Sequence, residues 1–243
     1  MKENKYDNSA FFDQYEKMLR SQLGLEGAGE WHALKNMLPG FKGKNVLDLG
    51  CGFGWHCRYA IENGAASVVG IDLSERMLTK AKEINNLKGI VYERKALEDV
   101  DYPAEQFDII LSSLTLHYVE SFDTTVQNIY RWLTSGGCFV FSVEHPVFTA
   151  EGSQDWVYDK DGEKTCWPVD RYFMEGKRNT TFLGENVIKY HRTLTSYLNT
   201  LLKHGFKIKE IIEPEPSTEM LKEIPEMKEE LRRPTMLLIS AEK

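Results

Sequence analysis

The chain has 243 residues, of which 42% are hydrophobic and 28% are charged, as in an ordinary globular protein rather than a disordered or fibrous one. This length suits one α/β domain with elaborations, which can bury its apolar surface without disulfide or metal support. The net charge of -7 at pH 7 and the lack of any lysine- or arginine-rich run disfavour a nucleic-acid partner.

Cysteine usage and hydropathy indicate the compartment. The four cysteines, Cys51, Cys57, Cys138 and Cys166, form no C-x-x-C pair, which is typical of reduced thiols. The residues after Met1 contain no apolar core of a secretory signal, and no segment reaches the length of a membrane span. We therefore expect a cytoplasmic protein with no membrane span.

Two helices are predicted before the first strand. Aromatic and aliphatic residues spaced three to four apart predict a helix over residues 9–23, with Tyr15 on its apolar face. The same spacing after Trp31 predicts a second, short helix that ends at Pro39-Gly40. These elements would form a helical N-terminal cap over residues 1–40.

Strands and helices then alternate through the middle of the chain. Apolar runs predict strands at about 44–49, 67–71, 90–94, 107–112 and 138–143. Helices are predicted at about 54–63, after a cap at Ser74, and at about 122–133. This alternation is typical of a parallel sheet with helices on both faces.

The pattern breaks after the fifth predicted strand. Residues 147–190 are rich in Trp, Tyr, Asp and Gly without a clear period, and so long a segment with little regular structure is usually a lid or an insertion. A helix is predicted at about 193–204, followed by strands that end at Ile212 and that cover 236–240. We expect residues 147–190 to cover the substrate side, and residues 191–243 to complete the sheet.

The most informative stretch is the sequence NVLDLGCGFGW, from Asn45 to Trp55. An apolar strand is followed at once by three glycines within five residues, and then by a helix. Glycine has no Cβ, so a ligand can lie against the backbone of such a turn, which is where open α/β sheets bind nucleotides. Asp72 ends the next strand, 20 residues beyond Gly52, where such folds place an acid on a ribose hydroxyl.

The glycine spacing distinguishes two classes of cofactor. A dinucleotide fingerprint that starts at Gly50 needs a glycine at position 55, where this chain has Trp55. Asp48 precedes the first glycine by two residues, and a carboxylate there repels a diphosphate but suits the ammonium and sulfonium groups of S-adenosylmethionine. An NAD-dependent oxidoreductase is therefore the weaker alternative.

The stretch Val46–Gly54, Asp72 and the later strand Phe107-Asp108-Ile109-Ile110 together resemble the class I S-adenosylmethionine-dependent methyltransferases. The likeness covers about residues 40–145 and is nearest to small-molecule enzymes such as the ubiquinone and menaquinone C-methyltransferases, of the methyltransferase domain 11 type. It implies a Rossmann-like, doubly wound seven-stranded sheet, mostly parallel with an antiparallel edge strand. Residues 41–146 would form the core that binds the cofactor.

The resemblance also implies a set of residues that bind the cofactor. Asp48 would orient the methionine amino group, and Asp72 would accept hydrogen bonds from both ribose hydroxyls. Ala96 stands where such families often carry an acid for the adenine amino group, so either backbone atoms of Leu97 or the side chain of Glu98 would serve instead. Tyr15 would cover the cofactor, unless it only completes the apolar face of its helix. The expected set is Tyr15, Arg20, Asp48, Gly50, Cys51, Gly52, Asp72, Leu73, Met77, Ala96, Leu97, Ser112 and Ser113.

Three histidines are predicted near the carboxyl edge of the sheet, as candidates for a catalytic base or a substrate cage. His117 follows the fourth predicted strand and is either a buried capping residue or a base, since an unperturbed imidazole titrates near neutrality. His145 follows the fifth strand, and His191 returns from the insertion together with Tyr190. Tyr118 is a further expected substrate contact. No metal is expected, because no pair of these residues has zinc-ligand spacing.

The reaction that the resemblance implies is in-line transfer of a methyl group from S-adenosylmethionine to a small-molecule acceptor, with S-adenosylhomocysteine as product. The stretch Ser112–His117 carries no N/D-P-P-Y/F motif, which by family analogy argues against methylation of DNA bases or glutamine. A non-catalytic protein that binds a cofactor or a partner on the same fold remains an alternative. Assembly as a homodimer is left open.

Overall fold

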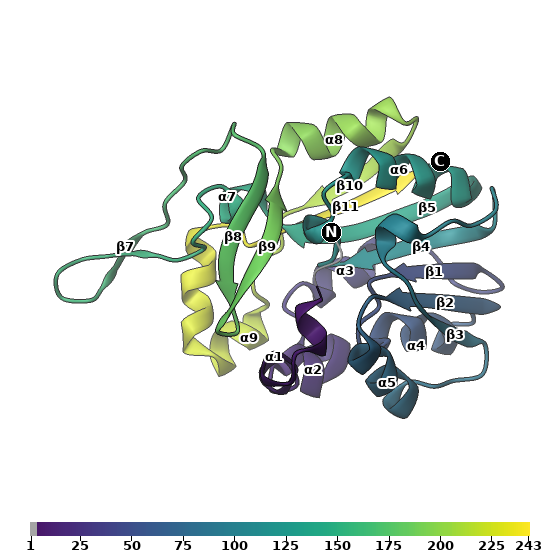
Figure 1. The fold of residues 1–243 in the computed structure, drawn as a ribbon, viewed down its shortest axis with the longest axis horizontal. Coiled ribbons are helices and arrows are strands. Elements are labelled where there is room, and N and C mark those ends of the chain that lie inside the picture. Colours follow the sequence, from purple (N-terminus) through teal and green to yellow (C-terminus); the bar gives the residue numbers. More distant parts are fainter. Residues whose placement is uncertain (1–3) are drawn as a thin grey trace.

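The computed structural model describes residues 4–243 of the chain. Seven strands form a central sheet with helices on both faces (Figure 1). They are β1 (Asn45–Leu49), β2 (Ser67–Asp72), β3 (Ile90–Arg94), β4 (Phe107–Ser113), β5 (Leu133–Glu144), β10 (Lys207–Ile212) and β11 (Met236–Glu242). Their order across the sheet is β10-β11-β5-β4-β1-β2-β3.

All neighbouring strands pair in parallel except β11, which runs antiparallel to both β5 and β10. The predicted Rossmann-like sheet is thus confirmed, and the pair β10–β11 forms its antiparallel edge. Strand β5 begins earlier than predicted, because Leu133 already pairs with Phe107 of β4. The residues Ser135, Gly136 and Gly137 therefore lie within the strand, whereas the sequence predicted its start at about residue 138.

Helices cover both faces of this sheet and bury its central strands. They are α3 (Trp31–Met37), α4 (Trp55–Glu62), α5 (Glu75–Ile84), α6 (Phe122–Trp132) and α8 (Leu194–Lys203). Neighbouring residues of a strand point to opposite faces, so Val46 packs with Trp31 of α3, while Leu47 packs with Trp132 of α6 and Tyr197 of α8. Burial on both faces holds the carboxyl ends of β1 and β4 on a rigid scaffold.

The N-terminal cap consists of η1 (Lys5–Asp7), α1 (Ser9–Tyr15), α2 (Leu19–Gln22) and η2 (Gly24–Gly27). The prediction of one helix over residues 9–23 is wrong, because Met18 has an extended backbone with φ -65° and ψ 145°. This break turns Arg20 toward the buried carboxylate of Glu30, with which it forms a charge-assisted pair. Tertiary contacts thus override the apolar periodicity of this segment.

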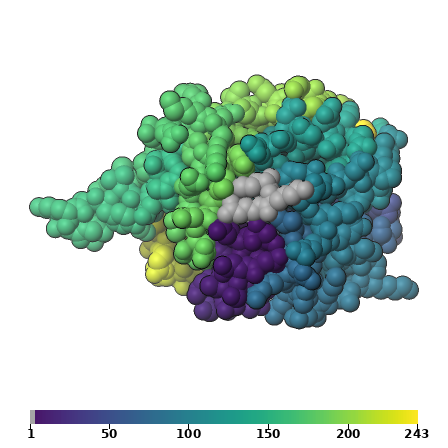
Figure 2. Space-filling model, in the orientation of Figure 1, coloured from purple at the N-terminus to yellow at the C-terminus, as the bar shows by residue number. Residues whose placement is uncertain are grey.

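The segment expected to have little regular structure contains two hairpins. After α7 (Pro146–Thr149), strands β6 (Val157–Tyr158) and β7 (Lys164–Cys166) form an arm that projects from the body (Figure 1). Strands β8 (Gly176–Phe182) and β9 (Glu185–His191) form the second hairpin, which lies beside the N-terminal segment (Figure 2). Helices α9 (Thr218–Glu223) and η5 (Pro225–Arg232) precede β11. Within residues 4–243, none of the helices combines the length and the apolar content needed to cross a bilayer.

Candidate functional site

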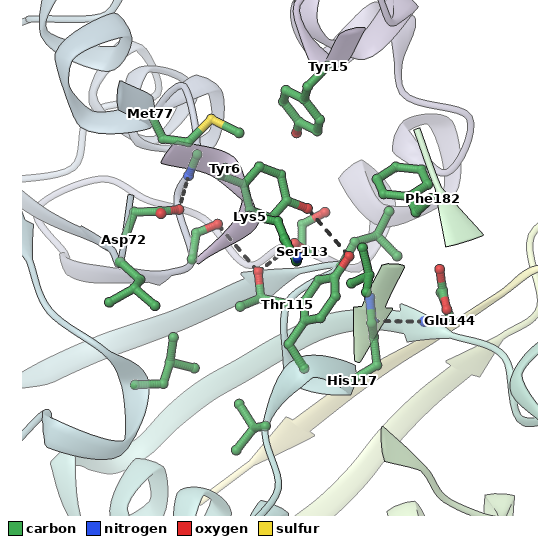
Figure 3. Close-up of a pocket in the computed structure, with 18 of the residues that line it drawn as sticks. Lys5, Tyr6, Tyr15, Asp72, Met77, Ser113, Thr115, His117, Glu144 and Phe182 are labelled. Carbon is green, nitrogen blue, oxygen red and sulfur yellow. Dashed lines mark hydrogen bonds between the residues drawn. The ribbon is translucent and has the colours of Figure 1, made fainter. Parts of the chain in front are cut away.

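A cavity of about 370 Å³ lies between the carboxyl edge of the sheet, the N-terminal segment and the hairpin β8–β9 (Figure 3). Asp72 and Met77 lie at one end, called here the Asp72 end, which the turns after β1, β2 and β3 form. Glu144 and Phe182 lie at the other, called here the hairpin end, which includes the residues after β4 and β5. The volume is within the range of about 300–1,000 Å³ that is typical of small-molecule sites.

The glycine turn after β1 leaves none of the amides of Gly50, Cys51 and Gly52 free for a ligand. Its backbone amides are engaged within the protein: those of Gly50 and Cys51 each donate to the carbonyl of Ile71 at 2.9 Å, and that of Gly52 donates to Asp72 at 3.0 Å. A pyrophosphate needs free amides at such a turn, whereas an ammonium group needs acceptors. The turn therefore suits a cationic ligand better than a dinucleotide.

Asp72 lies on the cavity wall with both carboxylate oxygens held by the backbone. Its Oδ1 accepts from the amide of Ser74 at 2.8 Å, and its Oδ2 accepts from the amide of Gly52 at 3.0 Å. Burial raises the pKa of this carboxyl to about 6. Because an ionised carboxylate has about four acceptor positions, two remain for hydroxyl groups of a ligand.

Three residues expected at the cofactor lie behind the cavity wall instead. Asp48 is only 1% exposed and accepts from the thiol of Cys57 at 3.3 Å, beneath the glycine turn. The side chain of Cys51 is buried as well, and Ser112 donates to the carbonyl of Leu49, which ties β4 to β1. None of the three lines the cavity. The structure thus places Asp48 beneath the glycine turn, and its expected contact with the methionine amino group stays a prediction.

The buried Asp48 predicts a pH dependence of stability. Burial raises the pKa of Asp48 to about 7, so the folded protein favours the protonated form. The unfolded chain loses this proton near pH 4, so the stabilisation is complete below that pH and is lost as the pH rises through about 7. We expect the free energy of unfolding to fall by about 2 kcal/mol between about pH 5 and pH 7.

Denaturant unfolding of the native chain and of Asp48→Asn at the two pH values measures this effect. The variant has no charge to bury and keeps an oxygen that can accept from Cys57, so it should lose most of the dependence. Asp72, whose pKa is also raised by burial, leaves a smaller dependence of the same sign. An unchanged slope in the variant would exclude Asp48 as the cause.

Arg20 and Tyr15 contribute to the cavity wall from the N-terminal cap. Nη2 of Arg20 donates to both oxygens of Glu30, at 2.7 and 2.6 Å, and Ser113 donates to the same carboxylate at 3.3 Å. Glu30 is 1% exposed, and its pKa is lowered because Arg20 offsets the cost of its burial. The pair holds Arg20 in place while its other N–H groups remain for a ligand carboxylate. Tyr15 also packs against Phe53, so it serves both the helix face and the cavity.

The three histidines do not converge, and only His117 lines the cavity. His145 caps α7, since its Nδ1 accepts from the amide of Val147, and its Nε2 lies 2.7 Å from Glu213. His191 is fully buried, with one ring nitrogen 2.7 Å from Thr149 and the other bonded to a backbone carbonyl. The three rings therefore form no common cage in this structure, and a role for any of them as a base stays a prediction. Tyr190 is also absent from the cavity wall, whereas Tyr118 lies on it.

Several residues on the cavity wall were not anticipated from the sequence. They come from the N-terminal segment, the turn after β4, the end of β5, the hairpin and the C-terminal segment: Tyr6, Met18, Thr115, Val119, Glu144, Phe148, Phe182, Val187, Ile188, Glu230, Thr235 and Met236. Thr115 and Glu144 could have been found, because each lies at or just beyond the carboxyl end of a predicted strand. The hairpin residues carry no such signal in the sequence.

Comparison with known proteins gives consistent matches. Residues 47–141 match the family described as methyltransferase domain. An uncharacterized protein of Haemophilus influenzae is 35% identical, over 98% of this chain and 96% of its own length.

Two crystal structures are also similar over most of the chain. A protein from Listeria monocytogenes that is assigned to the S-adenosylmethionine dependent methyltransferases is 60% identical, with a TM-score of 0.86, over 90% of this chain and 99% of its own. An S-adenosylmethionine dependent methyltransferase from Mesorhizobium loti is 45% identical, with a TM-score of 0.84, over 90% of this chain and 100% of its own.

Proposed function

This chain belongs to the S-adenosylmethionine-dependent methyltransferases, and from that premise we propose that its methyl acceptor is a small molecule. The proposal rests on the contacts between the N-terminal segment and the hairpin β8–β9, which cover the cavity. The N-terminal segment meets the hairpin through Phe11 and Phe182, whose ring centroids lie 5.8 Å apart, and through the ion pair of Lys5 and Glu185 at 3.9 Å. A folded protein or a duplex cannot reach the interior past these contacts.

S-adenosylmethionine supplies an electrophilic methyl group when it is bound. The residues on the cavity wall support one orientation of this cofactor. We place its ribose on Asp72 and its adenine against Leu73, Met77, Ala96 and Leu97, at the Asp72 end. The carbonyls of the glycine turn then face the ammonium group. Arg20 receives the carboxylate, since its guanidinium keeps N–H groups beyond those that bind Glu30.

In this orientation the chain acts mainly by positioning and by excluding water. The acceptor occupies the hairpin end, beyond Ser113 and Thr115, where Phe182 and the β8–β9 strands cover it (Figure 3). Holding two reactants in line contributes about 7–11 kcal/mol to catalysis of such a displacement. Asp48 supports the glycine turn from below in this scheme.

Calorimetry followed by a transfer assay tests the proposal. S-adenosylmethionine and S-adenosylhomocysteine should bind, and NAD should not. Methyl transfer should then occur to members of a panel of small acceptors, and not to folded proteins, peptides or RNA. Binding without transfer to any acceptor would favour the non-catalytic alternative, and transfer to a protein or nucleic acid would refute the small-molecule acceptor.

The glycine at the centre of the turn offers a second test. Gly52 lines the cavity, and a Cβ placed on it would meet no atom of the protein within 4 Å. We expect Gly52→Ala to weaken binding of S-adenosylmethionine about tenfold, because its methyl group occupies ligand space. Its φ of +52° adds a stability loss of about 1 kcal/mol.

The matched control is Gly136→Ala, at a glycine with φ +73°, also with nothing within 4 Å, in the strand β5. It should show a comparable loss of stability with unchanged affinity, measured by calorimetry and denaturant unfolding. Equal affinity in the two variants would mean that the ligand does not approach Gly52.

A further inference from the structure

We propose that the methyl acceptor presents an anionic oxygen, that of a carboxylate or a phenolate, to the Nε2–H group of His117. This inference rests on the proposed function and specifies the chemical class of its substrate. It also assigns His117 the part of a hydrogen-bond donor rather than that of a base.

The hydrogen bonds of His117 determine which ring nitrogen carries the proton. Nδ1 accepts from the backbone amide of Glu144 at 3.3 Å, so it cannot carry a proton in that geometry. The ring is 2% exposed, and burial lowers its pKa to about 4, which keeps it neutral. A neutral imidazole whose Nδ1 accepts has its single proton on Nε2. The nitrogen that remains for a ligand therefore donates.

The charges around His117 favour an anion in the cavity. Lys189, Arg192 and Arg20 act on the ring as cations and Glu144 acts as an anion, while Arg20 is itself paired with Glu30. The carboxylate of Glu144 is already engaged: Lys189 lies 2.5 Å from one of its oxygens, and Gln154 donates to the other at 2.7 Å. An ammonium group at this place would be repelled by Lys189 and Arg192, and both oxygens of Glu144 already accept a hydrogen bond.

The hydroxyl groups near His117 can also donate a hydrogen bond to an anionic ligand. The hydroxyls of Tyr6 and Tyr118, both on the cavity wall, lie 3.4 Å apart. Burial raises the pKa of both phenols, so each keeps its proton. One proton is used within the pair, and the second is available to a ligand oxygen. The other carboxylate of this region, Glu230, pairs with Arg233 at 3.0 Å.

The rest of the hairpin end is apolar and fits the body of the acceptor. It is lined by Phe148, Phe182, Val187, Ile188 and Met236. An acceptor of this class is therefore an apolar molecule with one anionic oxygen at its polar end. Burial of its apolar part contributes to binding at about 25 cal/mol per Å².

The transfer step then balances without a base. A lone pair of the acceptor oxygen forms the new O–CH₃ bond as the S–CH₃ bond breaks, and the electron pair of that bond stays on sulfur. The anion and the sulfonium become a neutral ester or aryl ether and a neutral thioether. No proton moves, which agrees with an imidazole whose accessible nitrogen can only donate.

Paired acceptors and two substitutions at one position test the inference. Methyl transfer is measured by mass spectrometry with benzoate against benzylamine, hexanoate against hexylamine, and 4-nitrophenolate against 4-nitroaniline. We expect the oxygen member to be preferred at least about tenfold in each active pair. His117→Leu should lower kcat/KM for that member about thirtyfold, whereas His117→Gln, which keeps an N–H group near Nε2, should stay within about threefold. The affinity for S-adenosylmethionine should be unchanged in both.

His32→Gln, at an exposed position of α3, is the matched control and should behave as the native chain. Preference for the amine members, lack of preference in every pair, or equal losses in His117→Gln and His117→Leu would overturn the inference. Binding of S-adenosylmethionine without transfer to either class would overturn it as well. If S-adenosylmethionine does not bind at all, the proposed function fails, and this inference fails with it.

Discussion

Replacing Asp72 by alanine is expected to weaken binding of S-adenosylmethionine at least about a hundredfold. Two hydrogen bonds from ribose hydroxyls to a charged acceptor contribute about 1.5–3 kcal/mol each. The same carboxylate accepts from the amides of Gly52 and Ser74, so its loss also loosens the turn against which the ligand lies. Loss of the ribose hydrogen bonds and loosening of the turn both weaken binding, so Asp72→Ala should cause the largest change in affinity for S-adenosylmethionine.

Calorimetry on Asp72→Ala and Asp72→Asn, with the free energy of unfolding measured in parallel, separates the two effects. The asparagine keeps the size and one acceptor oxygen, and should bind with intermediate affinity. Asp101→Ala, at a side chain that is 80% exposed, is the control and should bind as the native chain does. Native affinity in Asp72→Ala would show that the cofactor lies elsewhere.

Gly50→Ala is expected to cause the largest loss of stability, about 2–4 kcal/mol. The residue has φ +75°, which costs an alanine about 1 kcal/mol. In addition, its Cβ would lie 2.2 Å from Oγ1 and 2.4 Å from Cγ2 of Thr115, an overlap whose relief costs about 1–3 kcal/mol. Thr115 cannot simply rotate away, because its hydroxyl donates to the carbonyl of Ser113 at 3.0 Å.

Comparison with Gly43→Ala shows how much of the stability loss in Gly50→Ala comes from the overlap with Thr115. Gly43 has nearly the same φ, +74°, but its Cβ would meet nothing within 4 Å. Chemical denaturation should therefore show a loss of only about 1 kcal/mol in Gly43→Ala. Equal losses in the two variants would mean that the close approach of Thr115 to Gly50 is not rigid.

The central sheet could be predicted from the sequence because its local signals agree with the fold. The strands β1 (NVLDL) and β4 (FDIILSS) each contain a mostly apolar run, and a turn follows each of them. The hairpin β8–β9 could not be predicted, because the side chains that it buries include the polar residues Arg178, Thr180 and Lys189. Its turn uses Leu183 at φ +51°, where such turns usually have asparagine or glycine.

The candidate site was predictable at the Asp72 end and much less so at the hairpin end. The glycine turn and Asp72 have fixed spacing within one βαβ unit, so the sequence places them together. His117 and His145 lie beyond strand ends and His191 is the last residue of β9, yet their hydrogen bonds decide where each ring points. The proline after His145 starts a helix that this imidazole caps, and tertiary packing holds His191 against Thr149. Such tertiary contacts leave no periodic pattern in the sequence from which they could be predicted.

The contact between Phe11 and Phe182 has a kinetic consequence for the working enzyme. Because it joins the N-terminal segment to a hairpin over the cavity, we expect release of the spent cofactor to require that one of these elements moves. Motions of this kind take microseconds to milliseconds and often limit turnover. Where this motion limits turnover, kcat reports how often the N-terminal segment or the hairpin moves, rather than how fast the methyl group is transferred. An added viscogen should then lower kcat.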